Sequence, residues 1–121
     1  MTDRNAIEIG NVIFEQIRST VPNSYIMSWG AESWTALDSD EGFGLHFKVN
    51  GLLHKGFVEI ILDSGRDSYT INLLTRTGDI ANRVENVYVF ELGDVLDKLI
   101  ETGDMSKDEY KKQVKDWLDG K

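Results

Sequence analysis

The two histidines, His46 and His54, are the side chains best suited to acid–base or metal chemistry near neutral pH. They are eight residues apart and could share a metal ion only if both lay on one face of the fold. The strand pairing derived below places them on opposite faces, so we predict no metal site. We expect His54 to be a structural histidine near Phe47. His46 is expected on the face away from the core, where Glu59 or Asp63 could assist it as a general base.

The densest acidic group, Asp38, Asp40 and Glu41, begins like a calcium-binding loop but does not continue like one. The sixth position of that frame is Phe43 instead of glycine, and the twelfth is Val49 instead of glutamate. The chain has no cysteine, which excludes a thiolate nucleophile, a thiolate zinc site and a disulfide. No Ser/His/Asp spacing is distinctive. We therefore predict no catalytic residue, no metal ligand and no cofactor, and an enzyme using His46 is only an alternative.

The strands that would position these residues can be aligned from their turns. Asn50-Gly51 is typical of a two-residue type I′ turn, because both residues accept a positive φ. This turn pairs Phe47 with His54 across a hairpin. One face of the hairpin then carries all its large apolar residues, which are Phe43, Leu45, Phe47, Val49, Val58, Ile60 and Leu62. A slip by one residue would divide this set between the two faces.

A second turn continues the same pattern. Gly65-Arg66 favours a type II′ turn that pairs Leu62 with Tyr69, Ile60 with Ile71 and Val58 with Leu73, all on the core face. Upstream, a connection over 38–41 would pair Leu37 with Gly42 and places Trp34 inward. The result is an antiparallel meander of four to six strands, at 33–37, 42–49, 52–63, 67–76 and 84–91, with 24–28 as a short edge strand.

Helical periodicity appears at both ends of the chain. We predict a first helix at 4–20, capped by Asp3 and closed by Pro22, with an apolar stripe of Ala6, Ile9, Ile13 and Ile17. A C-terminal helix carries Leu92, Val95, Leu96, Leu99 and Ile100, and Gly103 ends it. Ser106 and Glu109 form a capping box that starts another helix, with Tyr110, Val114, Trp117 and Leu118 as its apolar face. The predicted fold is a single α+β domain over 1–121, with 92–121 as a helical hairpin and the helices packed on one face of the sheet.

The opposite face, called the outer face from here on, is mostly polar, but Phe57, Ile61 and Leu74 on it are apolar. The predicted pairing sets Phe57 against Leu74 and Ile61 against Thr70, so these side chains could form a patch. Its cover could be another part of this chain, a partner or a second copy, or it could be solvent. Trp29 is expected to be an exposed aromatic contact. The predicted interaction surface comprises Trp29, His46, Phe57, Ile61 and Leu74.

The charge balance restricts the class of partner. The 121 residues include 21 acidic and 13 basic side chains, for a net charge of −8. Such a chain repels phosphate, which disfavours direct nucleic-acid binding. An acidic surface keeps a protein soluble, and it could also imitate DNA. No segment approaches the ~18 apolar residues of a membrane span, and the first five residues are too polar for a secretory signal, so we expect a cytoplasmic location without membrane binding.

Several short patterns along the chain resemble a loose group of small uncharacterised proteins from bacteriophages and bacterial mobile elements. They are Ile13–Ile17, Met27–Ala31 followed by Trp34, Leu45-x-Phe47, Val58-x-Ile60, Asp67-x-Tyr69 and Val87-Tyr88. This resemblance covers about residues 6–100 and implies a fold of helix, antiparallel meander and helix, without an assigned activity. Residues 96–110 are similar to the helical-hairpin tails of bacterial proteins, which resemble oligomerisation or docking elements.

Three functions follow as hypotheses. The first is a non-catalytic protein-binding or accessory protein, of phage or mobile-element origin, that binds a protein partner or a second copy of itself. The second is an acidic inhibitor that imitates DNA. The third is an enzyme with His46 as general base.

Overall fold

The first helix forms where the apolar stripe predicts it. In the computed structural model, which describes residues 4–63, 65, 68–102 and 112, helix α1 spans Arg4–Thr20 and buries Ala6, Ile13 and Ile17. These residues recur at helical spacing, so they lie on the one face that contacts the sheet. The predicted bounds of 4–20 are confirmed, and the predicted cap, Asp3, lies outside the described residues.

The next segment corrects a prediction. Residues 24–28, expected as an edge strand, belong instead to a short helix, α2 (Asn23–Ser28). Pro22 precedes it with φ −60° and ψ 149°, an extended conformation suited to the residue before a helix. Tyr25 and Ile26 pack against the core, whereas Met27 is 80% exposed. Six residues are too few for a helical stripe to be recognised against a period of two.

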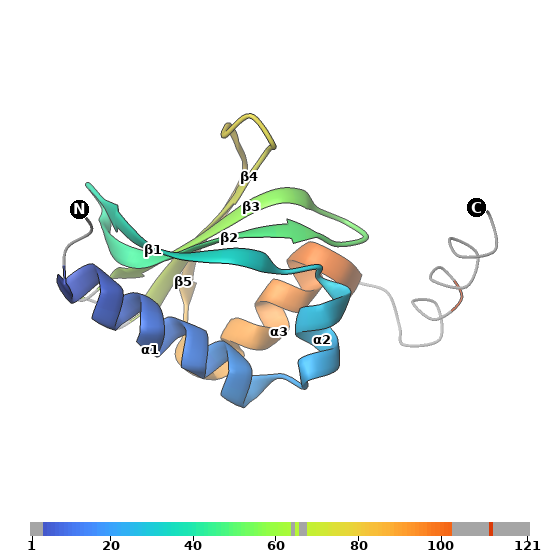
Figure 1. The fold of residues 1–121 in the computed structure, drawn as a ribbon, viewed down its shortest axis with the longest axis horizontal. Coiled ribbons are helices and arrows are strands. Elements are labelled where there is room, and N and C mark those ends of the chain that lie inside the picture. Colours follow the sequence, from blue (N-terminus) through green and yellow to red (C-terminus); the bar gives the residue numbers. More distant parts are fainter. Residues whose placement is uncertain (1–3, 64, 66–67, 103–111, 113–121) are drawn as a thin grey trace.

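Five antiparallel strands follow in one open sheet, in the order β1-β2-β3-β4-β5 (Figure 1). Every strand pairs with its neighbour in sequence, which makes the sheet a meander. The α+β class with an antiparallel meander is therefore confirmed. The strands are β1 (Glu32–Ser39), β2 (Gly42–Asn50), β3 (Lys55–Asp63), β4 (Ser68–Leu74) and β5 (Ile80–Val87).

The turn between β2 and β3 is longer than predicted. Asn50 pairs with Lys55, so four residues make the turn, and Phe47 faces Val58 instead of His54. The amides of Leu53 and His54 donate to the carbonyl of Ile100, at 2.9 and 3.2 Å. Contacts from a distant segment therefore outweigh the local preference of Asn50-Gly51 for a two-residue turn. The register shifts by four residues, and an even shift leaves every side chain on its predicted face.

The neighbouring hairpins follow the same rule. The β3–β4 register is confirmed, with Leu62 opposite Tyr69 and Ile60 opposite Ile71. Between β1 and β2, Leu37 pairs with Gly44 instead of Gly42, which is another even shift. Strand β5 begins at Ile80, four residues earlier than predicted, because a tight turn joins it to β4. In that turn the amide of Gly78 donates to the Thr75 carbonyl at 2.9 Å.

The C-terminal part of the described chain is helical. A 3-10 turn, η1 (Val89–Glu91), replaces the predicted end of the last strand. Helix α3 (Leu92–Asp97) and a π-helical turn, η2 (Lys98–Thr102), follow it. The predicted helix that starts at Ser106 lies outside the described residues. Figure 1 shows α1 and α3 on the same side of the sheet, so the helices cover one face.

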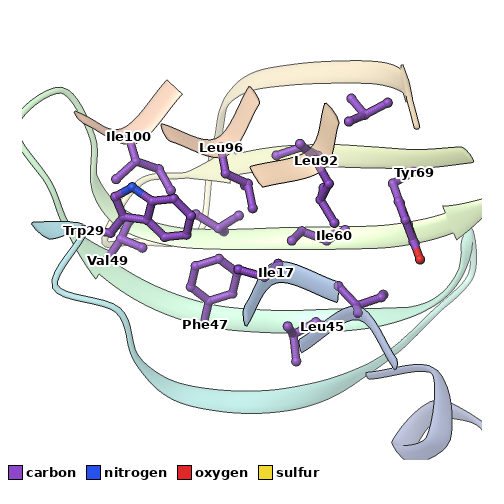
Figure 2. Close-up of a cluster of buried hydrophobic side chains, with 14 of the residues drawn as sticks. Ile17, Trp29, Leu45, Phe47, Val49, Ile60, Tyr69, Leu92, Leu96 and Ile100 are labelled. Atoms are coloured by element: carbon purple, nitrogen blue, oxygen red, sulfur yellow. The ribbon is translucent and has the colours of Figure 1, made fainter. Parts of the chain in front are cut away.

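The core lies between that face and the helices. Leu45, Phe47, Val49 and Ile60 point from the strands toward Ile17, Leu92, Leu96 and Ile100 of the helices (Figure 2). Trp34 is inward as predicted, because its ring stacks on Phe47 with the centroids 4.2 Å apart. The core face deduced from strand parity is therefore the observed one.

Candidate functional site

On the outer face, the structure brings together two of the predicted site residues. His46 on β2 and Phe57 on β3 are diagonal neighbours across the strand pair, and their rings stack with centroids 5.1 Å apart. Both side chains are half-buried. Leu74 lies directly opposite Phe57, as the sequence predicts. The aromatic pair and Leu74 therefore form one continuous group on this face.

The rest of the predicted patch is not exposed. Ile61 is only 4% exposed and Leu74 only 8%, although the helices pack against the other side of the sheet. Phe57, the third apolar residue of the predicted patch, is half-buried. In this conformation the predicted outer-face surface offers a partner little apolar area.

Among the residues considered for catalysis, the structure makes neighbours of His46 and Glu59 and separates the others. Glu59 lies opposite His46. Asp63 is four residues farther along β3, which places it roughly 13 Å from Glu59 at the rise of a strand. His54 lies in the β2–β3 turn, where its Nε2 is 3.2 Å from the carbonyl of Phe57. The prediction that His54 lies near Phe47 is wrong, because the longer turn moves it along the hairpin. Within the described residues, no three histidine or acidic side chains gather to hold a metal ion.

Trp29 is not a surface residue. It follows α2 directly, and its side chain is fully buried in the core (Figure 2). Its indole N–H donates to Oδ1 of Asp97 at 2.9 Å. The prediction that Trp29 is an exposed contact is therefore wrong. The backbone carbonyl of Trp29 also accepts a hydrogen bond from the amide of Asn50, at 2.8 Å. Trp29 thus ties α2 to α3 and to the end of β2, which is a structural role.

A different apolar surface is exposed, at the junction of α1 and η1. Phe90 is 77% exposed, and Val12, Tyr88 and Val89 are each at least 40% exposed. The rings of Tyr88 and Phe90 are parallel, with centroids 6.0 Å apart. Four large apolar side chains on adjoining elements form a patch of the kind that marks protein contact sites.

The local backbone explains why these side chains point outward. The amide of Tyr88 donates to the Glu91 side chain at 3.0 Å, and the amide of Glu91 donates to the Tyr88 carbonyl, also at 3.0 Å. This tight turn separates two buried residues, Val87 and Leu92. The chain therefore enters and leaves the core on either side of η1, and the turn between projects its side chains into solvent.

Three of these exposed side chains, Val12, Val89 and Phe90, line a shallow, open groove between α1 and η1, with a volume of about 680 Å³. We call it the α1–η1 groove, and its lining is Asn11, Val12, Glu15, Gln16, Ser19, Thr20, Val89 and Phe90. A smaller hollow of about 350 Å³ shares Gln16, Val89 and Phe90 with it. Gln16 is fixed between the two by the Tyr69 hydroxyl, which donates to its Oε1 at 2.6 Å. The groove therefore has an apolar wall from η1 and a mixed wall from α1.

The charged side chains of α1 near the groove are two glutamates and one arginine. Glu8 and Glu15 flank Val12 at spacings of four and three residues along α1, which places all three on one helix surface. Both carboxylates are exposed, and Glu15 pairs with Arg18 at 3.2 Å. These charges lie in a chain of net charge −8.

Part of this groove could have been predicted from the sequence, although the segment that forms one wall was interpreted as the end of a strand. The segment 87–90 is a run of four apolar residues, so an alternating strand at 84–91 must expose part of it. Val12 adjoins the core stripe of α1 without belonging to it. Neither feature shows that the two meet in space, because that depends on how α3 packs against the end of α1.

Comparisons with protein-family models, curated proteins and solved structures found no match for the chain. No helix among the described residues is long and apolar enough to cross a membrane.

Proposed function

We propose that this protein is a non-catalytic protein-binding or accessory protein, and that its α1–η1 groove binds an amphipathic helix of a partner protein. The exposure of Phe90 beside Val12 and Val89 carries the proposal, because an apolar side chain in that position loses solvent contact when a partner binds. Aromatic side chains of this kind supply much of the binding energy at protein interfaces.

The chemistry of the groove indicates the partner. One helix wall and one apolar wall fit the apolar stripe of a second helix, with anchors at i, i+3 or i+4 and i+7. Glu8 and Glu15 stand beside Val12, so lysine or arginine residues should flank that stripe. The proposed partner segment is therefore a basic amphipathic helix.

The test compares two substitutions to glutamate at exposed apolar positions. Phe90→Glu alters the groove, whereas Met27→Glu alters an exposed side chain on α2 that does not line it. Partners captured from a bacterial lysate by each full-length variant are identified, and the segment that binds is titrated as a peptide by calorimetry. Burying a charge in place of an aromatic anchor should cost about 2 kcal/mol, roughly a thirtyfold loss of affinity.

Other occupants would give different results. Equal affinity of the peptide for wild type and Phe90→Glu would contradict the groove as the binding site. A molar mass that doubles with concentration in light scattering, and does so only when Phe90 is intact, would show that a second copy fills the groove instead of a partner.

The DNA-mimic alternative has less support from the structure. Such a mimic needs unpaired carboxylates in an array that follows the DNA phosphates. Four carboxylates, which lie in four different parts of the fold, are instead paired with cations: Glu15 with Arg18, Glu32 with Lys48, and Glu41 and Glu85 with Arg83.

A further inference from the structure

The outer face contains buried side chains that none of the helices in the described part of the chain covers. Ile61, Ser68 and Asn72 project from β3 and β4 on the side opposite α1 and α3, yet each is at most 4% exposed. A flat antiparallel sheet would leave such residues in water. Among the described residues, the neighbouring strands must therefore supply much of their cover.

Two glycines allow β2 to fold sharply against β3. A Cβ on Gly44 would lie 1.8 Å from the carbonyl oxygen of Ile60, which no side chain tolerates. A Cβ on Gly42 would lie 2.9 Å from the carbonyl oxygen of Leu62 and 3.4 Å from the Ile61 side chain. Gly42 also has φ +144°, which favours glycine. The start of β2 thus lies directly against Ile61.

An ion pair joins the β1–β2 turn to the strand at the opposite edge of the sheet. Glu41 lies in the β1–β2 turn and Arg83 on β5, so the strand order separates them by the width of the sheet. Even so, the guanidinium donates to both carboxylate oxygens, at 2.6 and 3.1 Å. Arg83 is further held by Glu85 at 3.3 Å and by Asn72 at 3.4 Å. The pair therefore spans the outer face from the β1–β2 turn to β5.

We propose that the Glu41–Arg83 pair is a clasp that holds the β1–β2 turn over the outer face, and that its release exposes the buried side chains there. The side chains on the outer face are then buried while the clasp is closed. They become accessible to solvent when salt screens the ion pair or when a competing anion binds Arg83. The clasp is independent of the α1–η1 groove. Bidentate geometry supports it, since two parallel hydrogen bonds hold the two groups in one orientation. The hydrogen bond from Arg83 also lowers the pKa of Glu41, as expected for a carboxylate that is paired when the clasp is closed.

The chain has no cysteine, so a single introduced thiol can report on the clasp. Ser68→Cys is nearly isosteric and places a thiol on the outer face at a position that is 2% exposed. Its reaction rate with a thiol reagent measures how often this face opens. Glu41→Gln removes the negative charge and one of the two acceptor oxygens of the clasp, and a second variant, Arg83→Met, removes its donor. Glu85→Gln removes another partner of Arg83 and is the matched control.

Glu41→Gln and Arg83→Met should each raise the labelling rate of Ser68→Cys about two- to fivefold, the range expected of an exposed pair. Glu85→Gln should leave that rate unchanged. A thiol at Ala6, buried on the helix side, reports on unfolding of the whole domain. The proposal is overturned if Glu41→Gln leaves the labelling rate of Ser68→Cys unchanged, or if Glu85→Gln raises that rate as much as Glu41→Gln does. It is also overturned if Glu41→Gln raises the labelling rate of Ala6→Cys as much as that of Ser68→Cys.

Discussion

Replacing Trp29 with phenylalanine should destabilise the domain severely, although the sequence alone suggested a surface residue. The substitution removes the indole N–H that donates to Asp97 and part of a fully buried ring. A hydrogen bond to a charged group contributes about 1.5 kcal/mol. The lost ring volume adds about 1.5 kcal/mol. The free energy of unfolding should therefore fall by about 3 kcal/mol, which lowers Tm by about 12 °C for a chain of this length.

The matched control is Trp34→Phe. Trp34 is half-buried and stacks on Phe47, and phenylalanine keeps much of that stacking. Its substitution should cost about 1 kcal/mol. Urea unfolding followed by circular dichroism compares the two variants with wild type. If Trp29→Phe costs no more than Trp34→Phe, Trp29 does not hold α2 to α3, and the core described above is wrong.

The remaining predictions concern the outer face. Gly44→Ala should cost more than about 3 kcal/mol in urea unfolding, because its Cβ would meet the Ile60 backbone, whereas Gly78→Ala, with nothing within 4 Å, should cost only the strain of its positive φ; equal losses would contradict the close approach of β2 to β3. Because Arg83 lowers the pKa of Glu41, the clasp contributes stability that is fully present above the ordinary value of 4.5 and is lost as the pH falls through the lowered one. NMR titration of the Glu41 carboxyl should give a midpoint below 4.5 in wild type and a higher one in Arg83→Met, and a wild-type midpoint at or above 4.5 would show that the pair does not form.

Strand parity explains why much of the fold could be predicted. The β2–β3 register was wrong by four residues and the β1–β2 register by two. An even error moves a side chain along its strand but keeps it on the same face, so the predicted inner and outer faces survived both errors. The alternation of apolar residues therefore indicates the face of each side chain, even when the length of the turn is predicted wrongly.

The turns themselves depend on distant contacts. Asn50-Gly51 has the composition of a two-residue turn, yet the amide of Leu52 donates to the Glu101 carboxylate at 3.2 Å, and the next two amides reach Ile100. Residues about fifty positions away thus decide the geometry of the loop, and no local pattern records them.

The candidate site was the least predictable part. Whether Trp29 is buried depends on Asp97 of α3, and whether Phe90 is exposed depends on a 3-10 turn in place of a strand end. The predicted patch around Ile61 was on the correct face. Its burial, however, accompanies close contacts between segments distant in sequence, such as Gly42 against Ile61 and Glu41 with Arg83, which are 42 positions apart.

The affinity of the α1–η1 groove for the helix of its captured partner is the most direct test of the proposed function. Calorimetric titration should give a Kd about thirtyfold weaker for Phe90→Glu than for wild type, and an unchanged Kd for Met27→Glu. A partner helix that binds wild type and Phe90→Glu equally well would contradict the proposed role of this groove.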